Sequence, residues 1–185
     1  TILGIVVYGT DNLVDPIVNT IGNTLTPYGS SEGIQYRFIN GTSNFAGTIT
    51  GNTVNGGAIP IASTTSDHIL IQGNTVTGGG NGIVLETTAF TTVSQNTITG
   101  CTYNGVYVQS AWGLSHDNLI ADNTISGIHS GNTSTLGDCG WGIGLDSYYG
   151  NVANTIIIGN TVTSSDAGIV FYGVDATNVA HYNKL

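Results

Sequence analysis

The sequence contains almost no positive charge. Of its 185 residues, 2 are Lys or Arg and 11 are Asp or Glu, which gives a formal net charge of −9. Proteins that bind DNA or RNA neutralise phosphates with Lys and Arg, and anionic membrane surfaces attract the same side chains. Because only Arg37 and Lys184 are available, the composition argues against nucleic-acid binding and against docking on an anionic membrane.

Several other features are scarce. Met is absent, Pro occurs 3 times and Cys twice. No apolar run approaches the roughly 18 residues of a membrane-spanning helix, so we expect no membrane insertion. No segment longer than a turn or two shows the periodicity of an amphipathic helix. Helical bundles and membrane spans are therefore poor models for this chain.

The abundant residues favour strands and tight turns. Hydrophobic residues make up 39% of the chain and Gly contributes 28 residues, beside many Thr and Asn. β-branched residues suit pleated strands, whereas Gly and Asn suit turns. Only 7% of the residues are charged, so Asn, Thr and Ser must keep the surface soluble.

Three short motifs recur along the whole chain. The first is Asn-Thr-apolar-polar, and its copies begin at Asn23, Asn52, Asn74, Asn96, Asn123 and Asn160, with a clipped copy at Asn183. The second is a small residue followed by apolar-x-apolar, and it begins at Gly4, Gly33, Ala58, Gly82, Gly105, Gly142 and Gly168. The third is an apolar stretch before the Asn motif, as in Ile69-Leu70-Ile71. Each period therefore holds three short strands and three turns.

One such period cannot bury its apolar face alone, but stacked periods form a continuous core. The repeats therefore predict an all-β fold, a right-handed parallel β-helix of about seven three-strand coils without visible end caps. We expect one domain over residues 1–185, either a whole solenoid or a segment of a longer one. The repeated Asn is expected at the bend between the second and third strands, in the left-handed conformation and with its amide stacked on the next.

This pattern resembles the parallel β-helix repeat proteins, the pectate-lyase-like superfamily that includes NosD-type periplasmic proteins. The resemblance covers nearly the whole chain. It implies the fold but no single function, because the superfamily contains polysaccharide lyases, glycoside hydrolases, alginate epimerases, phage tailspikes, adhesins and surface proteins.

The first strand of each coil carries the most reactive side chains. One predicted outward row is Tyr8, Arg37, Ala62, Glu86, Gln109, Asp146 and Tyr172; the other is Val6, Gln35, Pro60, Val84, Tyr107, Gly144 and Val170. Glu86 and Asp146 are then two coils and about 10 Å apart, near the upper end for the acid and base of an inverting glycosidase.

We therefore consider Glu86, Asp146 and Tyr107 as catalytic candidates if the protein is an enzyme. Gln109, Trp112, Trp141 and Arg37 are the glycan-binding candidates. The alternative is a solvated polar face without chemistry, which we favour. A chain of this charge repels an acidic polymer unless Ca²⁺ bridges the two, so neutral glycans are the better substrates and no resident cofactor is expected.

The two cysteines occupy the same turn of adjacent coils. This placement makes a disulfide between Cys101 and Cys139 geometrically reasonable, and a disulfide implies an extracellular or cell-surface location. Two unpaired buried thiols are the alternative. Asn40 and Asn132 match the N-glycosylation acceptor pattern. No metal site is predicted, because the coil of Ala89 and Phe90 separates His68 from His116.

Thr dominates the outward positions of the Asn-led strands. Outward pairs are expected at Thr24/Thr26, Thr53/Asn55, Thr75/Thr77, Thr97/Thr99, Thr124/Ser126 and Thr161/Thr163. Such a regular array resembles the ice-binding face of some solenoid antifreeze proteins. The simpler explanation is that Thr suits exposed strand positions.

The two ends suggest either that the chain is part of a longer solenoid or that separate copies stack head to tail. From Asn183 through Leu185 to Ile5 is seven residues, which matches the interval from Asn52 to Ile59, so one copy could continue the coil phase of another. Open strand edges are templates for pairing, and head-to-tail contacts that do not close produce filaments.

The leading interpretation is therefore an extracellular structural or adhesive β-solenoid module. Its expected partners are a second copy, end to end, or further coils of a longer chain. The alternative is a carbohydrate-active enzyme or a glycan-binding β-helix with a polysaccharide partner.

Overall fold

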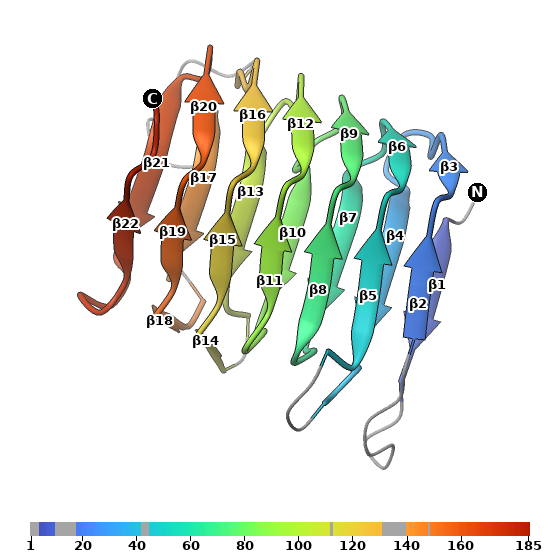
Figure 1. Ribbon diagram of the computed structural model, residues 1–185, viewed down its shortest axis with the longest axis horizontal. Helices are drawn as coiled ribbons and strands as arrows, with labels where there is room; N and C mark the ends of the chain where they lie inside the picture. Colours follow the sequence, from blue (N-terminus) through green and yellow to red (C-terminus); the bar gives the residue numbers. More distant parts are fainter. Residues whose placement is uncertain (1–3, 10–17, 42–44, 112, 131–139, 148) are drawn as a thin grey trace.

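The computed structural model describes residues 4–9, 18–41, 45–111, 113–130, 140–147 and 149–185. These residues form 22 strands and no helix. The chain winds through three parallel sheets, and successive coils lie side by side from one end of the molecule to the other (Figure 1). The predicted parallel β-helix of about seven coils is confirmed.

Each sheet takes one strand from each coil. The first sheet contains seven strands, in the order β1 (Ile5–Tyr8), β4 (Glu32–Arg37), β7 (Ile59–Thr64), β10 (Ile83–Glu86), β13 (Asn104–Gln109), β17 (Trp141–Asp146) and β21 (Ala167–Tyr172). The second contains β2 (Val18–Ile21), β5 (Gly47–Thr50), β8 (Ile69–Gln72), β11 (Thr92–Ser94), β15 (Leu119–Ala121), β19 (Ile156–Ile158) and β22 (Val179–His181).

The third sheet contains the Asn-led strands. They are β3 (Thr24–Leu25), β6 (Thr53–Asn55), β9 (Thr75–Thr77), β12 (Thr97–Thr99), β16 (Thr124–Ser126) and β20 (Thr161–Thr163). A further pair, β14 (Leu114–His116) and β18 (Asn151–Ala153), extends the turn between the first and second sheets in two coils.

The core consists of columns of aliphatic side chains that repeat from coil to coil. Each sheet contributes residues that are at most 2% exposed: Ile34, Ile61, Ile83, Val106 and Ile143 from the first, Ile49, Ile71, Val93, Ile120 and Ile157 from the second, and Val54, Val76, Ile98, Ile125 and Val162 from the third. Because every strand pairs in register, each side chain packs on its equivalents above and below.

The repeated Asn forms an uninterrupted ladder. The side-chain amide of each copy donates to Oδ1 of the next, over 2.9–3.0 Å, in the order Asn23, Asn52, Asn74, Asn96, Asn123, Asn160, Asn183. The expected stacking is confirmed. The expected left-handed Asn is wrong: the positive φ belongs to the residue before it, such as Gly73, Gln95 or Asp122. The Asn amide reaches both neighbouring coils, since that of Asn74 donates to the carbonyl oxygen of Ile49 and to Oδ1 of Asn96.

The Gly that opens the first strand faces the interior. A Cβ on Gly82 would lie 2.7 Å from Ile98 Cγ2 and 2.6 Å from the carbonyl oxygen of Gly105. Since the next residue, Ile83, is also buried, two consecutive positions face inward and the alternation is broken there. The residue before the Gly is therefore placed on the outer face, which brings Glu32 and Trp141 onto the outside of the first sheet.

The register predicted for the coil of β7 is wrong by two residues. Ile61, not Ile59, pairs with both Ile34 and Ile83. Thr64 therefore takes the place predicted for Ala62 beside Glu86, and Ala62 takes the place predicted for Pro60.

The same correction removes one argument about the two ends. From Asn52 to the residue in the column of Ile5 is nine residues rather than seven. The seven-residue interval that joins Asn183 to Ile5 therefore does not match this coil, and coil phase gives no support for joining one copy directly to the next.

Candidate functional site

The first sheet aligns the three predicted polar residues as expected. Gln109 pairs with Glu86 on one side and with Asp146 on the other. Tyr107 lies in the neighbouring outward row, opposite Val84 and Gly144. The predicted separation of Glu86 and Asp146 by two coils is therefore present in the structure.

Asp146 is held in a closed aromatic cluster. Its carboxylate is largely buried, with the residue 6% exposed, and its Oδ2 accepts a 2.6 Å hydrogen bond from the Tyr107 hydroxyl. The Trp141 ring lies across Gly144, where a Cβ would collide with it. The ring centroids of Tyr107 and Tyr172 are each 6.4 Å from that of Trp141.

This packing limits what the cluster can do. Trp141 is only 4% exposed, so a sugar ring has little of its face to stack on. Tyr172, at 48% exposed, is the aromatic side chain of the cluster most open to solvent. The burial of Asp146 and Trp141 favours a structural role over direct contact with a glycan, because a base or a stacking platform must be accessible.

Three charged side chains, Glu32, Arg37 and Glu86, lie further along the same face. Thr64 pairs with Arg37 and with Glu86, which places them two strands apart. Burial raises the pKa of Glu32, and the negative charge of Glu86 raises that pKa further, whereas Arg37 lowers it. The Nε atom of Arg37 is buried without a hydrogen-bond partner among the described residues.

Sequence reasoning missed Glu32 on this face. Strict alternation would turn it inward, since it precedes the buried Ile34 by two residues. The available signal was Gly33, because the lack of a Cβ permits two consecutive inward positions. The pKa of Glu32 responds to the charges of Arg37 and Glu86, so the three groups lie within electrostatic reach of one another.

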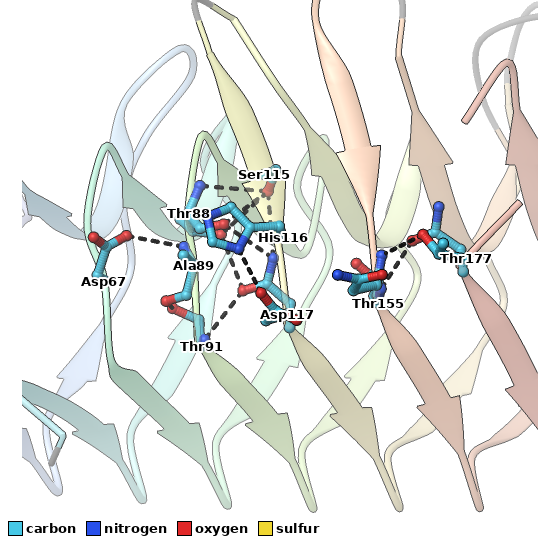
Figure 2. A network of polar contacts seen from close by, with 12 residues as sticks. Asp67, Thr88, Ala89, Thr91, Ser115, His116, Asp117, Thr155 and Thr177 are labelled. Carbon is cyan, nitrogen blue, oxygen red and sulfur yellow. Dashed lines mark hydrogen bonds and ion pairs between the residues drawn. The ribbon is translucent and has the colours of Figure 1, made fainter. Parts of the chain in front are cut away.

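A polar network occupies the turn between the first and second sheets (Figure 2). Asp67, Ala89 and His116 stack through parallel bridges, and Asp67 Oδ1 accepts a 3.0 Å hydrogen bond from the Ala89 N–H. The Ser115 hydroxyl donates to the carbonyl oxygen of Thr88 over 3.1 Å. These contacts satisfy turn backbone groups that would otherwise be buried without partners.

The consecutive residues Ser115, His116 and Asp117 do not form a nucleophilic triad. Asp117 Oδ2 lies 2.6 Å from Nδ1 of His116, but Ser115 is fully buried and its hydroxyl bonds Thr88. A nucleophile must reach substrate from within hydrogen-bond distance of its base. This Ser instead faces the interior, on the opposite side of the strand from the imidazole.

Phe90 separates the two histidines of this turn. Its ring stacks on His68 with centroids 4.8 Å apart and meets His116 edge-on at 5.4 Å. The two imidazoles therefore contact opposite sides of one aromatic ring instead of converging on a common point.

The remaining predicted residues fall partly outside the described structure. Trp112, Asn132 and Cys139 lie among residues that the structure does not describe. Cys101 is buried and has no disulfide partner among the described residues, and burial raises its thiol pKa to about 12. The disulfide with Cys139 thus stays a prediction. Asn40 is exposed, and its glycosylation also stays a prediction.

Residues 4–185 match the family model described as "Periplasmic copper-binding protein (NosD)". The chain belongs to this family. The membership agrees with the resemblance to right-handed parallel β-helix proteins and with an expected location outside the cytoplasm. No curated protein and no solved structure matches the chain.

The family description names copper, but the described residues of this NosD-family chain do not fit a copper centre. The sequence has no Met, and the soft thiol of Cys101 is buried against the carbonyl oxygen of Gly78. His116 and His129 each hydrogen-bond an aspartate. No three described His, Cys, Asp or Glu side chains are grouped as metal ligands, whereas copper sites in proteins are built from such convergent donors.

The described residues also contain no helix that is long and apolar enough to cross a bilayer.

Proposed function

We propose that this NosD-family protein is a structural β-helix module that associates head to tail with a second copy through its end coils. The observation that carries the proposal is the polarity of the Asn ladder. Every step has the same direction, with the N–H groups of one Asn donating to Oδ1 of the Asn in the following coil.

The two ends of the ladder are therefore complementary. At the first described coil, Asn23 Oδ1 accepts from no described residue, although every later Oδ1 of the ladder accepts two bonds. At the last described coil, the Asn183 amide donates to the carbonyl oxygen of Ile157 and to no described Asn. An Asn183 of one copy and an Asn23 of another would continue the ladder with a donor facing an acceptor.

The interior columns are also exposed at the last described coil. Phe171 continues the column of Leu145, which is completely buried, yet Phe171 is 41% exposed. Leu185, beside Gly168 in the same coil, is 72% exposed. Burying a fully exposed Phe side chain contributes about 1.5–3 kcal/mol. Phe171 would gain only the share that its exposed fraction represents, but a coil stacked on this end still gains apolar burial.

The backbone supports the same arrangement. β1 and β21 each pair with one strand of the first sheet, and no described strand pairs with their outer edges (Figure 1). A free parallel edge is a template for another strand. Because the two end faces differ, a contact between them is head to tail and repeats without closing, so it generates a filament.

The test is the concentration dependence of the mass in solution. Analytical ultracentrifugation of the parent is expected to show association beyond a monomer, and electron microscopy is expected to show rods. Phe171→Asp introduces a charge at the end face and should weaken association by at least ~10-fold, since a buried unpaired charge costs more than about 1.4 kcal/mol.

Phe90→Asp is the matched control. Phe90 is 47% exposed and lies on the side of the coil stack, so its replacement should leave association unchanged. A parent that stays monomeric at all concentrations refutes the proposal. Association that both variants weaken equally also refutes it, because the contact would not then be at the end face.

Glycan binding or cleavage on the first sheet is the second candidate. The alignment of Glu86, Gln109 and Asp146 across three strands favours it. A screen of neutral polysaccharides with Glu86→Gln beside the parent tests this candidate. The side-face variant Asp117→Asn is its control. Glycan binding or cleavage that Glu86→Gln leaves unchanged rejects the assignment.

A further inference from the structure

The outer face of the third sheet is an array of threonines in register. One column is Thr24, Thr53, Thr75, Thr97, Thr124 and Thr161, and the other is Asn55, Thr77, Thr99, Ser126 and Thr163. The residues between the columns face the core, as Val76 and Ile98 do. The six strands lie side by side in one row (Figure 1).

General strand preference does not explain this composition. Nine of the 11 outward positions in the third sheet are Thr. The 14 outward positions of the second sheet, which has one strand more, include 3 Thr, namely Thr48, Thr50 and Thr92. The two main outward rows of the first sheet also have 14 positions and include Thr64 alone. If Thr merely suited exposed strands, all three sheets would show it.

The array repeats at regular intervals in two directions. Strands of a sheet are about 4.8 Å apart, and alternate residues of one strand are about 6.6 Å apart. Thr is stiff at χ1 because it is β-branched, so its methyl and hydroxyl groups repeat with the backbone. Hydrogen bonds of the Asn ladder, directly before these strands, join each strand to the next and fix their register.

The hydroxyl groups of the array are largely directed to solvent. Thr75, Thr97 and Thr124 are exposed. Among the described contacts of the array, only the Thr99 hydroxyl donates to the protein, to the carbonyl oxygen of Val76 over 3.4 Å. The array strands contain no charged and no aromatic residue.

These features restrict the occupant. A protein partner needs anchors such as Trp, Tyr or Arg, and a small ligand needs a concave pocket; the array strands supply no such anchor. A polyanion needs cations. A face whose only distinction is two-dimensional regularity of hydroxyl and methyl groups is complementary to a surface that is itself regular and bonds through hydroxyl-like groups. Crystalline water is such a surface.

We propose that the outer face of β3, β6, β9, β12, β16 and β20 binds ice. Water held between the methyl groups and bonded to the Thr hydroxyls is ordered at the spacing of the array, and ordered water of this kind joins two surfaces at little enthalpic cost. The repeat along the coil axis is close to a repeat of the ice lattice, so every coil adds an equivalent contact.

The experiment measures thermal hysteresis and the shape of single ice crystals in solutions of the intact protein. The parent is expected to show both. Thr97→Tyr places a large ring at the centre of the array and should abolish most of the hysteresis, because it lifts the face from the crystal. Thr124→Tyr, one coil further on, should do the same.

Thr92→Tyr is the control within the same coil as Thr97, since Thr92 is an outward residue of the second sheet. It should retain the hysteresis of the parent. Circular dichroism and the thermal midpoint establish that each variant is folded.

Absence of hysteresis and of crystal shaping in the parent refutes the proposal. Equal loss in Thr97→Tyr and Thr92→Tyr refutes the assignment to this face. Retention on crystalline cellulose that Thr97→Tyr abolishes, without any effect on ice, assigns the array to a crystalline polysaccharide and overturns the proposal.

Discussion

The side-chain amide of Asn74 donates to Oδ1 of Asn96 over 2.9 Å, and the backbone N–H of Asn74 donates to the same oxygen over 2.9 Å. The amide of Asn96 in turn donates to the carbonyl oxygen of Ile71 and to Asn123. One buried side chain thus connects three coils and satisfies the backbone at the bend between the second and third sheets.

Replacement of Asn96 by Ala should lower the free energy of unfolding substantially. The change leaves the buried N–H of Asn74 and the carbonyl oxygen of Ile71 without their partners, and each orphaned group costs about 1–3 kcal/mol. We expect a loss of about 3 kcal/mol in urea denaturation. Asn19→Ala is the control, since Asn19 is exposed, and it should change stability by less than about 0.5 kcal/mol. Equal effects would contradict a structural ladder.

Replacement of Gly82 by Ala should also destabilise the fold. The new Cβ would lie 2.7 Å from Ile98 Cγ2 and 2.6 Å from the carbonyl oxygen of Gly105, so the two sheets must separate. Overpacking of this kind costs about 1–3 kcal/mol. At Gly113 the nearest atom to an added Cβ is Thr87 Cγ2 at 3.3 Å, and Gly113→Ala should be milder. The thermal midpoints of the two variants provide the comparison.

The Cys101 thiol should be unreactive in the reduced, folded protein. Burial raises its pKa from 9.0 to about 12, which lowers its thiolate fraction by about 1000-fold, and the thiolate is the reactive form. Modification by a thiol reagent should therefore follow unfolding of the chain. A reaction as fast as that of a free thiol would contradict the buried position.

The same thiol gives stability a defined dependence on pH. In the unfolded chain the Cys101 thiol ionises above about pH 9, whereas in the folded chain it stays protonated up to about pH 12. The contribution of this thiol to the free energy of unfolding is complete below about pH 9 and is lost as the pH rises toward about 12. Cys101→Ala should remove this part of the alkaline decline, which denaturant titrations of the reduced protein at several pH values can measure.

Asp166 should make the stability of the protein depend on pH in the acid range. Hydrogen bonds from the His129 ring and from the Ser130 N–H lower the pKa of this carboxyl below its ordinary 3.8. Its stabilising effect is therefore present above that value and is lost as pH falls through the lower, folded pKa. Asp166→Asn should decline less steeply on acidification than the parent. His129→Ala removes the main bond from the other side and should reproduce the effect; a slope identical to that of the parent in both variants would contradict it.

The sequence alone determined the repeating architecture. The spacing of Asn-Thr copies and of the small-apolar motif predicted three strands per coil, the stacked Asn amides and the inward columns of Ile and Val. These features are local patterns that every coil repeats, and stacking is the only way for so short a coil to bury its apolar face. The alignment of Glu86, Gln109 and Asp146 followed from the same periodicity.

Only the tertiary structure decided the register of Ile61 and the outward position of Trp141 and Glu32. A slip of two residues keeps the alternation of inward and outward side chains, so hydrophobic pattern could not distinguish Ile59 from Ile61. Hydrogen bonds between coils fix that choice. The inward Gly82 and its equivalents break the alternation because no Cβ fills the space beside Ile98. The hydrogen bond between Tyr107 and Asp146 joins side chains from different coils. No single repeat of the sequence contains both residues.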